Sequence, residues 1–195
     1  MKIAVIAAQG DFEEHVHMAN KALEKSGIKG KAFATIKKEE IRNADAIILP
    51  GGESTTISKL IFKESVAEEI KKAADEGKPI MGTCAGSILL AKHGDEQIAK
   101  TKTKLLELMD IWVKRNAFGR QRESFQIEID IKKIGRFEAV FIRAPVILKV
   151  ENNVEVLAKL NDYIVACQQN NLLALAFHPE LTNDTRIHEY FLEMQ

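Results

Sequence analysis

The chain has 195 residues, of which 28 are Lys or Arg and 28 are Asp or Glu, so its formal net charge at pH 7 is zero. A chain of this length can bury a sizeable core, and we expect residues 1–195 to form a single domain. Proteins that bind nucleic acids or membrane surfaces usually carry an excess of basic residues, so the balanced charge argues against both kinds of partner.

The first apolar run, over residues 2–8, is interrupted by Gln9-Gly10-Asp11. It is too short for the hydrophobic region of a signal peptide or for a membrane span, and no other apolar run is long enough. The sequence therefore predicts a cytoplasmic protein. In a reducing cytoplasm Cys84 and Cys167 should not form a disulfide. Neither belongs to a pair with the spacing of zinc ligands, so we expect no metal site.

Strands and helices alternate over the first half of the chain. Apolar runs that favour buried strands cover residues 2–8, 31–35, 44–49 and 79–81. Helices are predicted over residues 12–26, 39–43, 54–62, 65–76 and 87–93. This alternation predicts an α/β fold with a doubly wound, mostly parallel sheet and flanking helices.

The pattern changes in the second half of the chain. The polar residues 95–104 predict a solvated loop or a short helix. From residue 108 the helical period is lost, and additional strands are predicted over residues 110–114, 124–131, 137–142, 146–150, 154–160, 163–168 and 172–177. Asn170-Asn171 is a candidate turn. Thr182-Asn183-Asp184 is expected to cap a last helix that ends near Glu193.

Gly82-Thr83-Cys84-Ala85-Gly86 lies between a predicted strand and a predicted helix, and has the pattern of a nucleophile elbow. Such a strained turn raises the central side chain above the end of the sheet, and glycines on either side let the strand and helix pass closely. The dipole of the following helix would favour a thiolate. The alternative is a buried structural cysteine, because free cysteines are often buried.

A cysteine nucleophile needs a base, and the chain has five histidines. His178 directly follows a predicted buried strand, and in open α/β sheets such strand ends line the ligand crevice. For the other four we expect ordinary surface or helix-packing roles; they are His15, His17, His93 and His188.

Pro179 and Glu180 complete the pattern around His178. Proline restricts the preceding residue, so we expect His178-Pro179-Glu180 to be locally extended, with the side chains of His178 and Glu180 on the same side. Glu180 would then bind one imidazole nitrogen while the other faces Cys84, as in a catalytic triad. The alternative is a strand-terminal turn with an incidental histidine.

A glycine pair ends the predicted strand over residues 44–49. In Pro50-Gly51-Gly52-Glu53-Ser54-Thr55 the glycines allow backbone amides to turn towards a ligand, and Ser54 or Thr55 is a candidate helix cap. The loop lacks the pattern of a phosphate-binding P-loop. If this strand end lies beside the elbow, its amides could line an oxyanion hole.

Together these groups resemble the class I (triad) glutamine amidotransferases, and among them the glutaminase subunits of pyridoxal 5′-phosphate synthases. The resemblance runs from the first predicted strand almost to the last helix, in the family's order. Its motifs are Ala8-Gln9-Gly10 with Glu14-His15, and residues 49–56, 82–86, 115–121, 141–145 and 177–181. The polar stretch over residues 95–104 departs from the family's pattern.

The resemblance implies hydrolysis of L-glutamine to L-glutamate and ammonia by a Cys84–His178–Glu180 triad, through a thioester and without a cofactor. Backbone amides of Gly52 and Ala85 would hold the oxyanion. The family's glutamine-binding positions fall on Gly52, Glu53, Ser54, Arg115, Ile142 and Arg143. The charges of Glu53, Arg115 and Arg143 suit the α-ammonium and α-carboxylate of glutamine, although the sequence leaves open which group meets which.

The resemblance also implies a partner, a synthase subunit of (β/α)₈ fold that receives the ammonia. Docking would use the face that carries Gln9, Gly10 and the first helix. Because glycine tolerates both signs of φ, the Gly51-Gly52 peptide could flip between a resting and an active oxyanion hole. We therefore expect the isolated chain to be a poor glutaminase that its partner activates.

Three alternatives stay open at this point. The first is another amidotransferase of the same class, such as the glutaminase of histidine biosynthesis, although residues 115–121 and 141–145 favour the vitamin B6 branch. The second is a cysteine peptidase or a chaperone-like protein of related architecture. The third is a binding protein without catalytic activity.

Overall fold

The computed structural model describes residues 1–115, 117, 124–151 and 153–194. The strands of its main sheet are β1 (Lys2–Ile6), β2 (Lys31–Thr35), β3 (Ala46–Leu49), β4 (Ile80–Thr83), β5 (Ala91–Gly94), β6 (Met109–Lys114), β9 (Val146–Val150), β10 (Glu155–Leu160), β11 (Tyr163–Gln169) and β12 (Leu172–Leu175). Their order is β2-β1-β3-β4-β12-β11-β9-β6-β5, and β10 pairs with β11 off this path. A separate two-stranded sheet consists of β7 (Ser124–Ile131) and β8 (Gly135–Ile142).

The direction of strand pairing changes at β12. Strands β2, β1, β3, β4 and β12 are paired in parallel, whereas β11 runs antiparallel to β12, β9 and β10. Every residue of β3, β4 and β12 is buried, as expected for strands that are covered on both faces. The predicted doubly wound sheet with additional strands in the second half is therefore confirmed.

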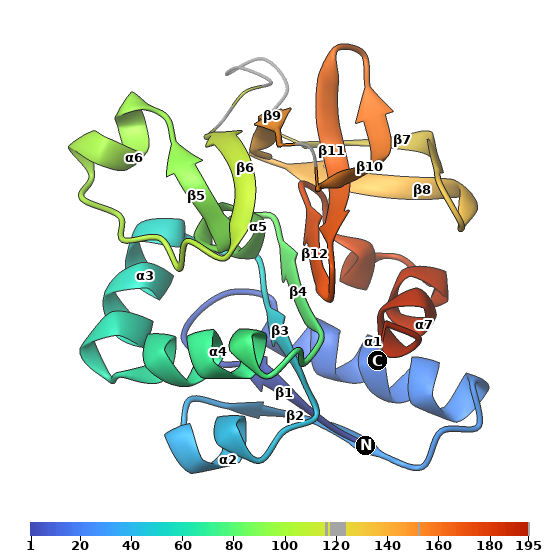
Figure 1. The fold of residues 1–195 in the computed structure, drawn as a ribbon. Coiled ribbons are helices and arrows are strands. Elements are labelled where there is room, and N and C mark those ends of the chain that lie inside the picture. The colour runs from blue at the N-terminus through green and yellow to red at the C-terminus, as the bar shows by residue number, and fades with distance from the viewer. Residues whose placement is uncertain (116, 118–123, 152, 195) are drawn as a thin grey trace.

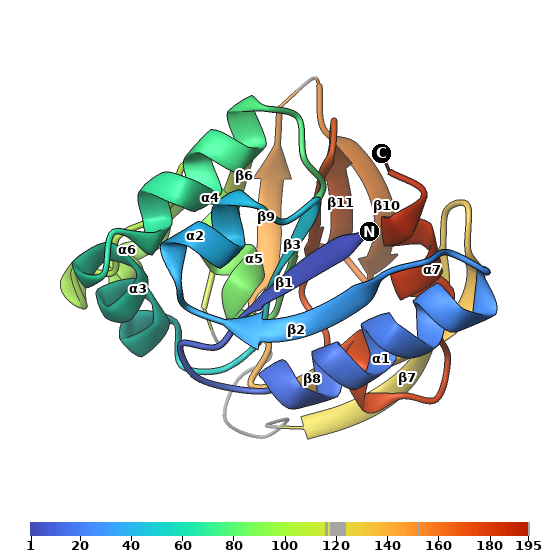
Figure 2. The ribbon, with the colours of Figure 1, turned by 90° about the horizontal axis from the view of Figure 1, so that it is seen from below.

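Helices cover both faces of this sheet. They are α1 (Phe12–Lys25), α2 (Lys38–Arg42), α3 (Ser54–Lys63), α4 (Val66–Asp75), α5 (Ala85–Leu90), α6 (Glu96–Lys100) and α7 (Arg186–Leu192), and a 3₁₀ turn, η1 (Pro179–Leu181), follows β12. Figures 1 and 2 show α1 beside α7 on one face and α2, α3 and α4 on the other. None of the helices in the described residues is long and apolar enough to cross a membrane.

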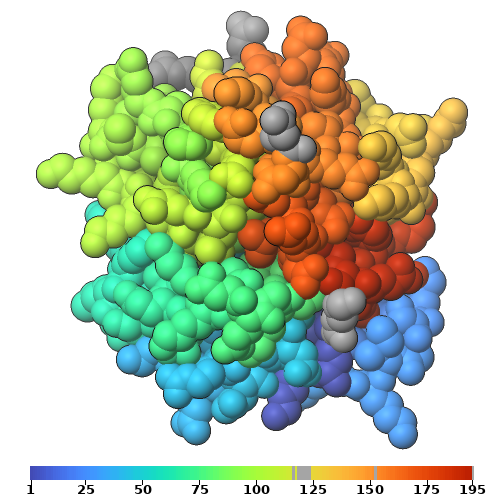
Figure 3. Space-filling model, in the orientation of Figure 1, coloured from blue at the N-terminus to red at the C-terminus, as the bar shows by residue number. Residues whose placement is uncertain are grey.

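Two hydrophobic cores lie on the two faces of the sheet. One contains Ile57 and Ile70 from α3 and α4. The other contains Leu23 of α1 and Phe191 of α7, together with Phe137 from β8, so the two-stranded sheet closes this core beside the helices. In the space-filling view, strands β7–β12 fill the upper right of the molecule, above the helices of the first half (Figure 3).

Three local predictions need correction or refinement. The helix predicted over residues 87–93 ends at Leu90, because residues 91–94 pair with β6 as strand β5, where His93 stacks on Trp112 with ring centroids 4.0 Å apart. The last helix begins only at Arg186, whose backbone N–H donates to Asp184. The polar stretch over residues 95–104 contains α6, which is capped by Asp95.

The parallel strands bring four connecting segments to one edge of the sheet. Leu49 at the end of β3 is in register with Gly82 of β4, and Thr83 at the end of β4 is in register with Leu175 of β12. Because the carboxyl ends of parallel strands lie at the same edge, the segments that follow these strands are neighbours. Three of these segments contain Gly51, Cys84 and His178, and the fourth, after the adjacent strand β1, contains Gln9-Gly10-Asp11.

Gly86 of the elbow packs against the backbone at the end of β3. A Cβ atom at this position would lie 2.0 Å from the carbonyl oxygen of Leu49. We expect Gly86→Ala to lower the free energy of unfolding by about 3 kcal/mol, at the upper end of the range for overpacking, because the atom it meets is backbone.

Gly27→Ala is the matched control for this prediction. Gly27 has φ +67°, but a Cβ atom added there would have no heavy atom within 4 Å. Its substitution should cost about 1 kcal/mol from the left-handed backbone alone. Urea unfolding followed by circular dichroism gives both values, and an equal loss in the two variants would show that the Gly86 contact does not limit packing.

Candidate active site

Cys84 occupies the sharp turn between β4 and α5. Its backbone has φ 47° and ψ −106°, a sparsely populated conformation for a residue with a side chain. The turn is held by the Cys84 N–H, which donates to the carbonyl oxygen of Leu175 at 2.8 Å, and by the Ser87 hydroxyl, which donates to the carbonyl oxygen of Cys84 at 2.7 Å. The side chain therefore lies at the carboxyl edge of the sheet, as the elbow pattern predicts.

His178 enters the same edge from β12. Its N–H donates to the carbonyl oxygen of Val140 at 2.8 Å, and its Nδ1 lies 2.7 Å from Oε1 of Glu180. The predicted extended conformation is wrong, because residues 179–181 form the 3₁₀ turn η1. Proline at the first position of a helical turn fixes a suitable φ and needs no N–H partner. Glu180 folds back on His178 through this turn.

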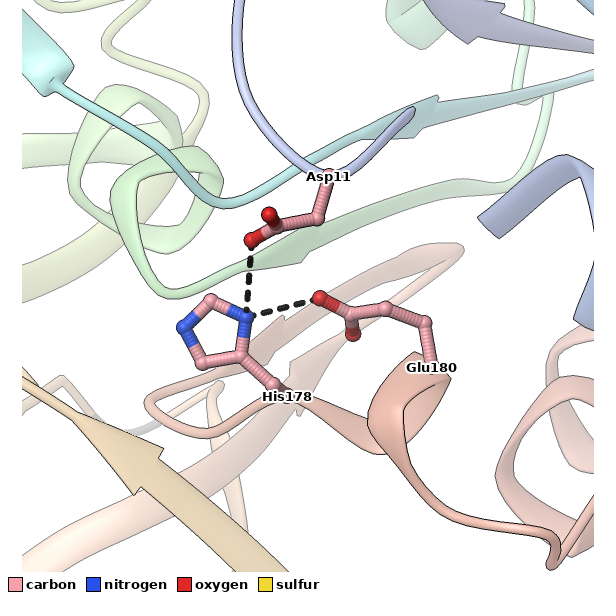
Figure 4. Close-up of side chains that lie close together, drawn as sticks. All are labelled: Asp11, His178 and Glu180. Carbon is pink, nitrogen blue, oxygen red and sulfur yellow. Dashed lines mark hydrogen bonds and ion pairs between the residues drawn. The ribbon is translucent and has the colours of Figure 1, made fainter. Parts of the chain in front are cut away.

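A second carboxylate, which the sequence analysis missed, faces the same imidazole nitrogen. Oδ2 of Asp11 lies 3.4 Å from Nδ1 of His178. Figure 4 shows Asp11 and Glu180 approaching Nδ1 from different segments, while the other side of the ring points away from both. The Asp11 side chain is 40% exposed, whereas that of Glu180 is fully buried. Asp11 follows β1 at the same edge of the sheet, and this position in the sequence could have identified it as a site residue.

These contacts determine the charge of the site. Burial alone would lower the pKa of His178, but Asp11, the Cys84 thiol and Glu180 outweigh it and raise that pKa well above its usual range. Burial alone would raise the pKa of Glu180, but His15 and His178 lower it well below its usual range. The arrangement thus favours an imidazolium beside an ionised carboxylate, which is the form that can protonate a leaving group.

The thiol and the imidazole influence each other's charge, but no well-aligned hydrogen bond joins them in this structure. The Cys84 thiol donates to the carbonyl oxygen of Ile142, with Sγ and O 3.8 Å apart. Nε2 of His178 is buried and has no hydrogen-bond partner among the described residues. Nucleophile and base are often this loosely arranged before substrate binds.

The glycine loop after β3 packs directly against the histidine. A Cβ atom at Gly51 would lie 2.4 Å from Cε1 of His178, and one at Gly52, which has φ +139°, would lie 2.7 Å from Oε1 of Gln9. The Gln9 side chain also accepts the backbone N–H of Glu53 at 2.7 Å. The loop therefore lies beside the elbow, as expected from the sequence, and is held from the other side by the segment after β1.

Glu53 rather than Ser54 or Thr55 caps helix α3. Its carboxylate accepts the N–H groups of Thr55 and Thr56 at 3.0 and 2.7 Å. Partial burial alone would raise the pKa of Glu53, but the hydrogen bonds from Thr56 and Thr55 lower that pKa to about 2. The longer glutamate side chain can reach both amides from the preceding residue, which corrects the predicted cap.

Arg115 also faces this region. Its Nη2 lies 3.4 Å from Oε1 of Glu53, and its Nη1 lies 3.4 Å from the hydroxyl oxygens of Thr55 and Thr101. Its backbone N–H donates to Asp95 at 3.0 Å. The polar stretch that departs from the family's pattern therefore supports a candidate substrate-binding residue.

The other residues predicted to bind glutamine do not take part in the contact between Glu53 and Arg115. Ser54 is buried, and its hydroxyl has no partner among the described residues. Ile142 contributes the carbonyl oxygen that meets the Cys84 thiol. Arg143 is exposed and has φ 42°. Of the motif over residues 115–121, residues 116 and 118–121 lie outside the described residues.

Two of the histidines assigned to ordinary roles lie behind the candidate triad. His17 is exposed and His93 stacks on Trp112, but His15 and His188 are fully buried. Nε2 of His15 lies 3.2 Å from Oε2 of Glu180. The helical spacing could have predicted that His15 is buried, because it lies on the same face of α1 as the buried residues 18, 19, 22 and 23.

Asp11, His178 and Glu180 form the one group of at least three His, Cys, Asp or Glu in the described residues whose ligand atoms lie within 4.8 Å of one another. In Figure 4 both carboxylates are directed at the same nitrogen, Nδ1. Hydrogen bonding and ion pairing account for these contacts, so we assign no metal to the group.

The buried histidine of α7 makes stability depend on pH. Complete burial lowers the pKa of His188 to about 3, compared with about 6.5 in an unfolded chain. Between these values only the unfolded chain binds the proton, so the free energy of unfolding falls as pH decreases. This group alone should reduce it by about 2 kcal/mol between pH 7 and pH 5.

His188→Leu should remove that part of the pH dependence. Urea unfolding at pH 7 and pH 5 measures it, with His17→Leu, an exposed position, as the control. The decrease between the two pH values should be smaller in His188→Leu than in the wild type and unchanged in His17→Leu. An unchanged decrease in His188→Leu would contradict the assignment of a neutral, buried imidazole.

The geometry agrees with comparisons to known proteins. Residues 5–195 match the model of the SNO glutamine amidotransferase family. The chain is 61% identical to pyridoxal 5′-phosphate synthase subunit PdxT of Archaeoglobus fulgidus, covering 100% of this chain and 98% of that protein. It is 51% identical to the protein of the same name from Methanosarcina barkeri, covering 99% and 97%.

Comparison with a solved structure also points to a glutamine amidotransferase. A crystal structure described as a glutamine amidotransferase is 45% identical and has a TM-score of 0.87, covering 98% of this chain and 97% of that chain. The family model covers nearly the whole chain, and the similarity extends through every strand that carries a candidate catalytic residue. The chain therefore belongs to the SNO glutamine amidotransferase family.

Proposed function

We propose that this chain hydrolyses L-glutamine to L-glutamate and ammonia and supplies the ammonia to a pyridoxal 5′-phosphate synthase. The observation that carries the proposal is the meeting of Glu180, His178 and the elbow residue Cys84 at one edge of the sheet, in a member of a glutamine amidotransferase family. The PdxT relatives are named as synthase subunits, and we extend that role to this chain.

The proposed reaction has two halves, formation of a thioester on Cys84 and its hydrolysis, and all three triad residues act in both. The Cys84 thiolate attacks the side-chain amide carbon of glutamine, and the oxyanion is held by the amides of Gly52 and Ala85. His178 gives its proton to the departing ammonia, which leaves a thioester. It then takes a proton from water, whose oxygen attacks the thioester, and returns that proton to the sulfur as glutamate leaves. Glu180 orients His178 and stabilises its imidazolium.

One oxyanion-hole donor contributes about 3 kcal/mol to lowering such a barrier. The proposed glutamine contacts are Gly52, Glu53, Ser54, Arg115, Ile142 and Arg143. Glu53 and Arg115 already face each other at 3.4 Å, and the ends of glutamine would compete with that contact. A single domain over residues 1–195 would contain all of these groups, since one continuous sheet carries the triad.

We further propose that a synthase subunit of (β/α)₈ fold docks on the face of Gln9, Gly10 and α1 and activates the site. Two observations support a resting state in the isolated chain. The Cys84 thiol donates to the carbonyl oxygen of Ile142, and Nε2 of His178 has no hydrogen-bond partner among the described residues. The Gly52 backbone adopts φ +139°, a conformation that glycine leaves easily, against the Gln9 side chain.

The nucleophile is tested by substituting each cysteine in turn. Cys84→Ala should reduce glutamine hydrolysis by roughly 10⁴-fold or more, because the thioester cannot form. Cys167→Ala is the control, since Cys167 is also free and buried, and burial raises the pKa of its thiol to about 12. Glutamate release in the presence of the synthase partner is the measurement. Normal activity of Cys84→Ala would overturn the proposed nucleophile.

Activation and ammonia transfer are tested with the purified synthase partner. Glutaminase activity should rise on the order of 100-fold when the partner is added, which corresponds to about 3 kcal/mol of differential affinity for the active state. The Cys84→Ala complex should form pyridoxal phosphate from an ammonium salt but not from glutamine. Full activity of the lone chain would refute the switch, and product from glutamine in that complex would refute the division of labour.

A further inference from the structure

Two buried imidazoles form a second layer behind Glu180 that the proposed reaction does not use. His15 lies on α1 and His188 on α7, and both are 0% exposed. Nε2 of His15 lies 3.2 Å from Oε2 of Glu180 and 2.9 Å from the Thr83 hydroxyl oxygen. Nδ1 of His15 lies 3.2 Å from Nε2 of His188.

The positions of the protons on His15 and His188 follow from the nitrogen of this pair that has no hydrogen-bond partner among the described residues. Nδ1 of His188 is buried and has no hydrogen-bond partner among the described residues. A buried N–H without a partner is rarer and more costly than an unused acceptor. The proton of neutral His188 is therefore on Nε2, from which it is donated to Nδ1 of His15. The proton of His15 is then on Nε2, the nitrogen that faces Thr83 and Glu180.

Glu180 needs a second partner because it is fully buried. Its Oε1 meets His178, whereas its Oε2 has no hydrogen-bond partner among the described residues and is ion-paired with Nε2 of His15 at 3.2 Å. An ionised carboxylate in such surroundings is strongly destabilised unless hydrogen-bonded. We propose that His15 is a positioning residue for glutamine hydrolysis: it holds Glu180 ionised and directed at His178, and His188 fixes the tautomer in which His15 can do so.

The surrounding charges agree with this assignment. Glu180 is approached by His15 from α1 and by His178 from the segment after β12, and His188 of α7 stands behind His15. Asp11, from the segment after β1, contacts His178. Burial alone would raise the pKa of Glu180, and His15 is the foremost of the contacts that lower it. Removing His15 should therefore raise that pKa and shift the acid limb of the activity to higher pH.

This inference rests on the proposed function, and two amide variants of His15 test it separately. The His15→Gln amide extends to the position of Nε2 and can donate to Glu180. The His15→Asn amide reaches only the position of Nδ1, so it meets His188 but not Glu180. The matched control is His17→Asn, an exposed position on the same helix. Far-ultraviolet circular dichroism and thermal melting establish that each variant folds.

The measurements are kcat and KM for glutamine and the pH profile of kcat/KM, all with the synthase partner present. His15→Asn should lose about tenfold in kcat with little change in KM, as when an outer partner of an active-site group is removed. Its acid limb should move up by about one pH unit. His15→Gln should recover most of both losses, and His17→Asn should match the wild type.

The outcomes distinguish failure of this inference from failure of the proposed function. An inactive wild-type complex would overturn the proposed function itself. An active wild type with equal activity and an unshifted acid limb in His15→Asn would overturn the role of His15. Equal losses in the Gln and Asn variants without any shift of the acid limb would mean that His15 only fills space, and would also overturn the proposal.

Discussion

The parallel pairing of β3, β4 and β12 is the constraint on which the site depends. The register places Leu49 beside Gly82 and Thr83 beside Leu175, so the glycine loop, the cysteine and the histidine leave the sheet at the same level. No single segment of the chain contains the site. Its geometry is instead determined by backbone hydrogen bonds between three buried strands, which are among the least deformable parts of a protein.

Polar groups buried at this edge stabilise one another as a series. Asp11 and Glu180 meet His178, and His15 and His188 continue behind Glu180. Each member would be costly to bury alone, and its neighbour lowers that cost by supplying a donor, an acceptor or an opposite charge. The series also joins α1 and α7, two helices distant in sequence, to the end of β12. Catalytic geometry and packing on this face of the sheet therefore depend on the same contacts.

The sequence predicted the parts of this arrangement that are local. Apolar runs identified the strands, and the G-x-C-x-G pattern and the strand end before His178 identified the residues that the structure brings to one edge. Prediction failed where position depends on tertiary context. His15 lies in an ordinary amphipathic helix, and only the packing of α1 against α7 reveals what it faces. Asp11 is typical of a helix start, Pro179 lies in a turn rather than an extended segment, and the Glu53 cap depends on a loop held by Gln9.

The isolation of the two thiols has a consequence for oxidation. Cys167 of β11 pairs with Ala174, which pairs with Gly82 of β4, so two strand spacings, roughly 10 Å, separate it from the elbow strand. That exceeds the separation a disulfide can bridge. If peroxide converts Cys84 to a sulfenic acid, no second thiol of this chain can resolve it. Recovery would then depend on an external thiol acting before the irreversible sulfinic stage is reached.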